Sequence, residues 1–343
     1  MLVLSLFLAR RDDWRSSSFN TFLLICSLWL VPVALSTLVQ HLVSLKTATP
    51  AAELIKLLLR TAGVGLGILL LLERRWLTIK QAALILLGAL ALHALAGLFE
   101  LLQRPTALQF DWRRIRLVGL SGNPNPFGTF MALSLILCVG LLRYRPRNLF
   151  LYLTLGASTI CVFGSGSRGA ILVSTVGVLM VFLPLNRRSL AILGACLLAT
   201  SIAYITTDWS RLFSHSDQSR VVALRFAVDA IQQRLLTGWG IGSFSLIPGH
   251  KGILVPHNML VDLAIGSGMI ALLGWGLSTA WLVQRLLGCI TPSARITLAL
   301  LIAAILAGSL EYSLTSSAHF RGIWVVLTAF ACYIISRPEP STP

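Results

Sequence analysis

The sequence contains about ten runs of roughly 16–25 mostly apolar residues, separated by short polar segments. A helix rises about 1.5 Å per residue, so a run of this length matches the roughly 30 Å hydrocarbon core of a bilayer. One or two such runs would indicate a membrane anchor, whereas about ten make the bilayer the main solvent of the fold. The predicted spans are residues 19–40, 53–72, 77–101, 126–142, 149–163, 169–185, 189–206, 266–286, 296–312 and 321–336.

The composition supports the same fold class. Of the 343 residues, 56% are hydrophobic and only 12% are charged, and the mean hydropathy is +0.83. An ordinary soluble domain carries about twice that share of charge. We therefore expect an all-α protein, a polytopic transmembrane helical bundle with about 10 spans, in which residues 1–343 form a single integral membrane domain.

The formal net charge is +16, and much of it sits in short connections between the apolar runs. This distribution argues against nucleic-acid binding, which would gather Lys and Arg on one polar face. Short connections rich in Lys and Arg are typical of the cytoplasmic side of a membrane, and with an even number of spans both termini are then cytoplasmic. The opposite, outer face carries two long connections, 103–125 and 207–267, and the second is expected to contain helices.

Several kinds of site are missing from the sequence. The six cysteines include no CxxC pair, so neither a disulfide framework nor a zinc site is indicated. Only 12 Asp and Glu residues occur, with no DxD, HExxH or paired-carboxylate arrangement on the outer face, so metal-assisted phosphoryl transfer and two-carboxylate glycoside hydrolysis are poorly supported. There is no P-loop, no GxSxG, and no GxGxxG that opens a helix after a strand. We predict neither a cofactor nor a metal.

Two short outer segments depart from ordinary membrane-protein composition. Ser121–Pro126 reads SGNPNP, and its Gly and Pro content predicts a tight turn; a simple turn leading into the next span is the alternative. Gly164–Gly169, GSGSRG, joins two spans across a connection too short to reach far into water. Arg168 should then lie near membrane depth, where a charge usually faces a cavity or a partner. Its guanidinium and the neighbouring amides would suit a phosphate, and snorkelling to the interface is the alternative.

The long outer connection holds a third group of candidates. Arg220 stands before a predicted helix over 221–235, and the stretch Thr237–Phe244, TGWGIGSF, follows that helix. His257 and Asn258 precede the eighth span, so His257 should lie near the bilayer surface. A histidine suits general-base chemistry on a hydroxyl group, although a lone loop histidine is more often incidental.

Taken in order, these segments resemble the O-antigen ligase and O-antigen polymerase family of bacterial envelope enzymes, over about residues 119–271. Each segment is weak alone, whereas five in the family's order on one predicted face are fairly specific. The family usually has a proline where Arg234 stands. The resemblance is carried by Gly-Asn-Pro-Asn at 122–125, Ser-Arg-Gly at 167–169, Ser219-Arg220, Thr-Gly-Trp-Gly-Ile-Gly-Ser-Phe at 237–244, and His257-Asn258 followed by Gly268.

The resemblance implies a glycosyltransferase that moves a glycan from an undecaprenyl-pyrophosphate carrier to an acceptor. The acceptor is lipid A–core for a ligase, which we favour, and a second carrier-linked glycan for a polymerase. Such an enzyme lies in the bacterial inner membrane among its lipids, with a periplasmic active site built partly on residues 207–267. We expect His257 to be the catalytic base, and Arg168 and Arg220 to hold the pyrophosphate without a metal. The expected secondary substrate-binding residues are Asn258, Arg113, Arg114 and Arg116.

Two interpretations of other classes stay open. A polysaccharide transporter would carry several ionisable residues along a path at mid-bilayer, and the sequence has few in its spans, mainly Lys56, Arg60 and His93. A non-catalytic envelope protein would tolerate loss of the three proposed site residues, and only the ordered motifs argue against it.

Overall fold

The structure is a computed structural model that describes residues 16–44, 49–103, 116–182, 215–241, 244, 247–250, 258–289, 291–311 and 318–337. All regular secondary structure in these ranges is helical, which confirms the all-α prediction. The elements are α2 (Ser17–Ser44), α3 (Thr49–Glu73), α4 (Ile79–Leu102), the 3-10 helix η2 (Gly119–Ser121), α5 (Pro124–Leu142), α6 (Leu149–Gly164), α7 (Arg168–Phe182), α9 (His215–Gln233), α10 (Met259–Leu287), α11 (Pro292–Glu311) and α12 (Ala318–Ser336).

Six of these helices, namely α2, α3, α4, α5, α10 and α11, contain segments long and apolar enough to cross a membrane. Three shorter apolar helices, α6, α7 and α12, coincide with further predicted spans, while the predicted span 189–206 lies outside the described residues. The chain is thus a multi-pass membrane protein. The eighth predicted span, 266–286, lies within α10, which begins earlier, at Met259, and is interrupted at Gly268.

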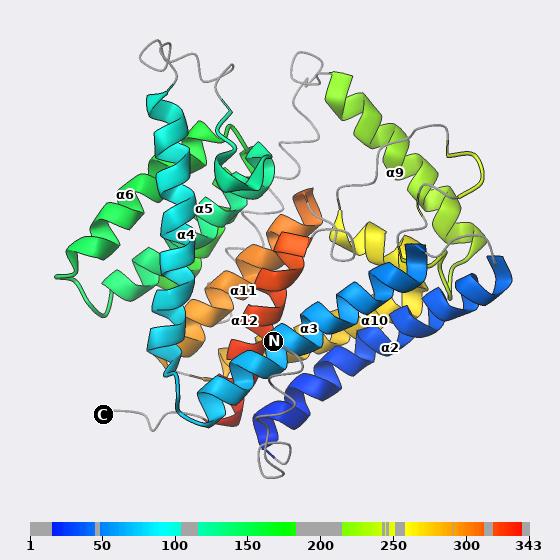
Figure 1. The fold of residues 1–343 in the computed structure, drawn as a ribbon, viewed down its shortest axis with the longest axis horizontal. Helices are drawn as coiled ribbons and strands as arrows, with labels where there is room; N and C mark the ends of the chain where they lie inside the picture. Colours follow the sequence, from blue (N-terminus) through cyan, green and yellow to red (C-terminus); the bar gives the residue numbers. More distant parts are fainter. Residues whose placement is uncertain are drawn as a thin grey trace.

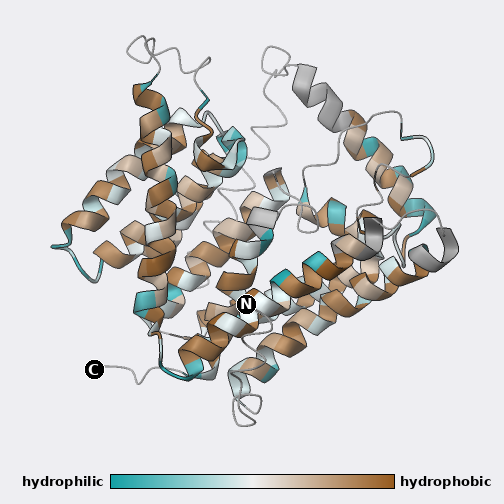
Figure 2. Cartoon of the chain, in the orientation of Figure 1, coloured by the Kyte–Doolittle hydropathy of each residue, from teal (hydrophilic) through white to brown (hydrophobic). Residues whose placement is uncertain are grey.

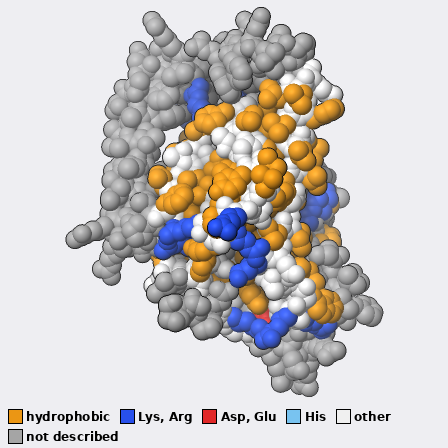
Figure 3. All heavy atoms as spheres, turned by 90° about the vertical axis from the view of Figure 1, so that its left-hand side faces the viewer, with side chains coloured by type: hydrophobic (Ala, Val, Ile, Leu, Met, Phe, Trp, Pro, Cys, Tyr) orange, Lys and Arg blue, Asp and Glu red, His pale blue; other side chains and the backbone are white. Residues whose placement is uncertain are grey.

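The outer surface of the bundle is hydrophobic, as contact with a bilayer requires, because large hydrophobic side chains point outward from the spans. Figure 2 shows hydrophobic residues along the helices and hydrophilic residues mainly at helix ends and connections. Figure 3 shows one face, on which hydrophobic side chains cover much of the surface and Lys and Arg gather mostly in its lower half. Exposed examples on α4 and α6 are Leu92, Leu95, Phe99, Leu153 and Phe163.

The helices form two groups that α11 joins (Figure 1). In one group α4, α5, α6 and α7 pack against one another. In the other, α10 packs on α2, and α12 packs on α2 and α3. Since α11 contacts α5 and α7 as well as α10 and α12, it forms the link between the groups. Helix α9 lies outside both groups and contacts α10.

Small residues allow the helices to approach closely, as is usual where lipid removes the hydrophobic drive for helix association. A Cβ atom on Gly128 of α5 would lie 2.5 Å from Ser165 Oγ and 2.9 Å from Ala170 Cβ. On α10, a Cβ atom on Gly274 would meet the carbonyl group of Leu28 in α2. These contacts place α5 at the centre of its group and press α10 onto α2.

The helix directions separate two ends of the bundle. The end at which α3, α5, α7, α10 and α12 finish is here called the basic end, because its described connections carry Arg74, Arg75, Lys80, Arg143, Arg145, Arg147, Arg285, Arg295 and Arg337. The opposite end, at which α5, α7 and α10 begin, is called the loop end. This separation agrees with the alternation that the charge pattern predicted.

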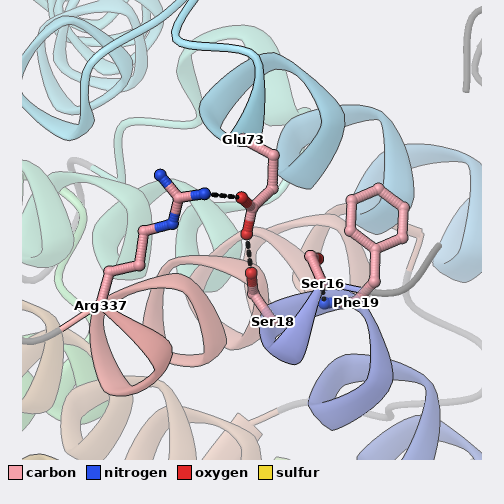
Figure 4. Close-up of polar contacts among 5 residues, drawn as sticks. All are labelled: Ser16, Ser18, Phe19, Glu73 and Arg337. Carbon is pink, nitrogen blue, oxygen red and sulfur yellow. Dashed lines mark hydrogen bonds and ion pairs between the residues drawn. The ribbon is translucent and has the colours of Figure 1, made fainter. Parts of the chain in front are cut away.

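Three helices are tied together at the basic end by one carboxylate (Figure 4). Glu73, at the end of α3, accepts hydrogen bonds from the Ser18 hydroxyl of α2 and from Arg337, which follows α12. The Glu73 side chain is 5% exposed, whereas that of Arg337 is 44% exposed. A second serine, Ser16, accepts a hydrogen bond from the Phe19 amide and caps the start of α2.

We expect Glu73→Gln to lower the free energy of unfolding by about 1–2 kcal/mol, because it removes the charge that holds Arg337 and weakens the acceptor of Ser18. The measurement is an SDS unfolding titration in mixed micelles. Lys80→Gln is the matched control, an exposed charge at the same end of the bundle. An unchanged transition in Glu73→Gln would contradict a stabilising role for this cluster.

Candidate functional site

A returning segment at the loop end brings Arg116 to the bundle. Glu100, near the end of α4, accepts hydrogen bonds from the backbone amides of Val118 (2.9 Å) and Gly119 (3.0 Å). The Leu117 amide donates to the Gly164 carbonyl at the end of α6 (2.9 Å), and the Leu117 side chain is fully buried. Arg116 is therefore held beside the connection between α6 and α7.

Two arginines flank that connection. The Arg116 guanidinium donates to Asn125 Oδ1 at the start of α5 (2.8 Å). Its side chain passes over Gly166, where a Cβ atom would lie 3.7 Å from Arg116 Cγ. Arg168 is the first residue of α7 and is exposed. We call this arrangement, Arg116, Asn125 and residues 164–168, the arginine turn.

The local sequence explains the arginine turn. Asn123 caps α5 through a hydrogen bond from the Asn125 amide (3.0 Å), and Pro124 occupies the first helical position, where its missing N–H costs nothing. Ser167 accepts from the Ala170 amide (3.1 Å) and so caps α7 directly before Arg168. The tight turn predicted from SGNPNP is present. Two helices thus begin beside the two arginines, and helix N-termini favour anions.

A second structured region surrounds the interruption of α10. In an unbroken helix the Met269 amide would donate to the Ile265 carbonyl, four residues back. Instead it donates to the Leu235 carbonyl (2.8 Å). The carbonyls of Ile265 and Gly266 accept from the amides of Trp239 and Gly240, each at 2.8 Å. We call residues 234–241 the docking loop, because their backbone replaces the missing helical bonds.

Glycines make this backbone approach feasible. Gly268 has φ 76° and ψ 177°, a conformation essentially restricted to glycine, and a Cβ atom there would collide with the Leu236 carbonyl. Opposite it, Gly238 has φ +66°, and a Cβ atom would lie 2.6 Å from the backbone nitrogens of Ser267 and Gly268. The TGWGIG pattern is thus explained by close contact of two backbones.

The docking loop is also bound to the outer half of α2. Ser36 donates to the carbonyls of Thr237 and Gly266. The Gln40 amide group donates to the Gly238 carbonyl (3.3 Å) and its oxygen accepts from Arg234. The Arg234 guanidinium also lies 4.1 Å from the centre of the Trp239 ring. Arg234 therefore has a structural role here.

A small hydrophobic cluster holds α9 against this region. We call it the outer cluster, because it is separate from the main core of the bundle. His250 packs against the rings of Phe226 and Phe244, with centroid distances of 5.9 and 5.2 Å. The buried members of the outer cluster are Ala227, Ala230, Phe244, Ile247 and Ile265.

Asn258 is the N-cap of α10. Its Oδ1 accepts from the amides of Leu260 (2.9 Å) and Val261 (3.1 Å), and its Nδ2 donates to the Ser309 carbonyl of α11 (2.6 Å). Most of its hydrogen-bonding capacity is therefore used to fix the start of α10 to α11. Substrate binding by Asn258 stays a prediction, and only its remaining N–H would serve it.

Other predicted site residues are placed less completely. His257, Arg113 and Arg114 lie outside the described residues. The backbone of Arg220 is described and lies inside α9, so the prediction that it precedes the helix is wrong; α9 spans His215–Gln233 rather than 221–235. Its early start agrees with the low helix-breaking content of residues 215–220, which contain no Gly or Pro.

The structure also reveals residues that the sequence did not single out. Glu100 positions the segment that carries Arg116, and its place near a span end was the only signal. Arg321, in the first turns of α12 at the loop end, is only 1% exposed. In the sequence, the feature that could have identified Arg321 is that it is a single charged residue at the start of an apolar run. Among the described residues, no group of three or more His, Cys, Asp or Glu could hold a metal ion.

Comparison with known proteins identifies part of the chain. Residues 150–276, less than half of the sequence, match the model of a protein family described as O-antigen ligase. No curated protein matches the chain. The matched range includes Arg168 of the arginine turn, α9 with Arg220, the docking loop, His257 and the interruption of α10 at Gly268.

We expect Gly268→Ala to destabilise the protein by at least about 1–3 kcal/mol, because alanine cannot adopt this backbone conformation without strain. Hydrogen–deuterium exchange should show faster exchange of the Trp239 and Gly240 amides, which lose their acceptors when the docking loop is displaced. Gly276→Ala in the same helix is the control, since a Cβ atom there meets nothing within 4 Å. Equal exchange in the two variants would contradict this role of Gly268.

Proposed function

We propose that this chain, with its O-antigen ligase domain over residues 150–276, is a membrane glycosyltransferase that moves a glycan from undecaprenyl pyrophosphate to lipid A–core. The loop end would face the periplasm, and both termini would lie in the cytoplasm of a bacterium. The basic residues at the opposite end support this orientation, because short basic connections are retained on the cytoplasmic side.

The observation that carries the proposal is the arginine turn. Arg168 is exposed at the N-terminus of α7, and Arg116 lies beside the same connection, fixed by Asn125. Two guanidinium groups near two helix N-termini make a strongly anion-attracting surface at the end of a membrane bundle. A lipid-linked pyrophosphate presents its charge at this depth, directly above its hydrocarbon chain.

The chemistry needs an anion-binding group and a base. Arg168 and Arg220 bind the pyrophosphate, and His257 takes the proton of the acceptor hydroxyl as its oxygen attacks the anomeric carbon. The bond between that carbon and the phosphate oxygen breaks with inversion, and undecaprenyl pyrophosphate leaves with both electrons of that bond. Arginine supplies the positive charge here, so the reaction is proposed to be metal-independent.

The rigid start of α10 supports the assignment of the base. His257 directly precedes Asn258, whose amide is bound to α10 and α11 at once. Helix α11 also packs on α5 and α7, the two helices that begin at the arginine turn. The backbone next to the proposed base and the start of α7 with Arg168 therefore belong to one packed unit. Arg113, Arg114, Arg116 and Asn258 are proposed as secondary contacts to donor or acceptor.

We expect Arg168→Ala to lower the rate of glycan transfer by about 100-fold, the usual loss when one donor to a developing anion is removed. Arg168→Lys should recover part of the rate, because lysine keeps the charge but lacks the bidentate fork. The rate is measured with purified protein in vesicles. Arg225→Ala, which removes an exposed arginine of α9 at the same end, is the control. Equal rates in the Arg168→Ala and Arg225→Ala variants would refute the assignment.

We expect His257→Ala to abolish transfer of a radiolabelled lipid-linked glycan to lipid A–core, with a loss of about 100- to 10,000-fold, while the wild-type protein remains active in chelator. Elongation on the carrier without transfer to core would identify a polymerase instead. If neither product forms with wild-type protein, the transporter or non-catalytic interpretation replaces the proposal.

A further inference from the structure

We infer that α9 is an interfacial helix whose stripe of Leu224, Val228 and Leu235 is immersed in the bilayer leaflet at the loop end. The inference concerns how the outer region is held at the membrane, and it does not depend on the reaction proposed above.

The first argument is the distribution of side chains around α9. Ala223, Ala227 and Ala230 are buried, and the last two belong to the outer cluster. At 100° per residue, Leu224 and Val228 lie roughly 110° around the helix from this alanine face. Contact with the rest of the protein therefore explains why small alanines occupy the buried face. It does not explain why Leu224 and Val228, which lie away from that face, are hydrophobic.

The stripe is exposed along its length. Leu224, Val228 and Leu235, which follows the end of α9, are 48%, 45% and 50% exposed. Gln232 lies about 40° from Val228, at the edge of the stripe. Arg225, Asp229 and Gln233 are exposed on a separate face, which also carries the exposed Val222. A helix with one face on protein, one apolar face and one polar face is suited to the boundary between lipid and water.

The second argument is depth. The part of α10 that follows its interruption, residues 269–287, is roughly 28 Å long, close to the roughly 30 Å of a hydrocarbon core. Gly268 then lies at the membrane surface. The docking loop directly follows α9 and is bonded to the carbonyls of Ile265 and Gly266. The C-terminal end of α9 is therefore fixed at the same surface.

The third argument is direction and continuity. In Figure 1, α9 lies beside the outer ends of α2 and α3 and is inclined to both, so it does not continue or run parallel to either. The docking loop is held by Gln40 of α2, and α2 exposes Leu35, Leu38 and Val39 just before that residue. The lipid-facing surface of α2 thus leads to the end of α9. Trp239 and Arg234, stacked at this point, are residue types common at membrane interfaces.

Site-specific fluorescence quenching tests the inference. Single cysteines replace Leu224 and Val228 in the stripe, and Asp229 and Gln233 on the polar face as matched controls. The background is the full chain with Cys196→Ser and Cys289→Ser, because Cys26, Cys138, Cys161 and Cys332 are buried. Each variant is labelled with bimane and reconstituted alone in phosphatidylcholine–phosphatidylglycerol vesicles. Quenching is measured with a lipid that carries a nitroxide near its headgroup, and separately with iodide.

The expected result is at least threefold stronger quenching by the nitroxide lipid at positions 224 and 228 than at 229 and 233, with the opposite order for iodide. Equal iodide quenching at all four positions would overturn the inference, since water would then cover the stripe. Protection of 224 and 228 from both quenchers would also overturn it, because a protein surface, such as a second copy of this chain, would then be the partner.

Discussion

The interruption of α10 at Gly268 is the constraint on which the outer region depends. It leaves the carbonyls of Ile265 and Gly266 without their helical donors, and an unpaired carbonyl near the hydrocarbon region costs several kcal/mol, by order of magnitude. The docking loop removes this cost with two backbone amides. Displacement of the loop would expose both carbonyls at once, so α9, the first part of α10 and α2 are held as one unit.

Backbone groups at helix ends that need hydrogen-bond partners also determine the structure of the arginine turn. Asn123 and Ser167 satisfy amides at the starts of α5 and α7, and Glu100 satisfies two amides of the returning segment. Short polar residues thus hold Arg116 and Arg168 at the bundle end. An arginine at membrane depth needs a cavity or a partner of opposite charge, and the proposed function supplies an anion to both.

The two ends of the bundle are stabilised in different ways. At the basic end, side chains from α2, α3 and the segment after α12 meet at Glu73. At the loop end, the contacts are mostly between backbone groups, or between a short side chain and the backbone. Backbone contacts at glycine allow close approach and precise register, which suits a region where several loops must be positioned together. The family match covers most of this loop-end structure.

The sequence by itself determined the membrane class, most of the span boundaries and the turn at Ser121–Pro126, because the length of an apolar run and the geometry of Gly and Pro are local properties. The tertiary structure decided the meaning of the TGWGIG stretch. Its amides pair with carbonyls of an interrupted helix, and Gln40, which binds Gly238, is 198 residues away in the chain. Whether a glycine continues or interrupts a helix depends on which distant backbone is present to replace the lost hydrogen bonds.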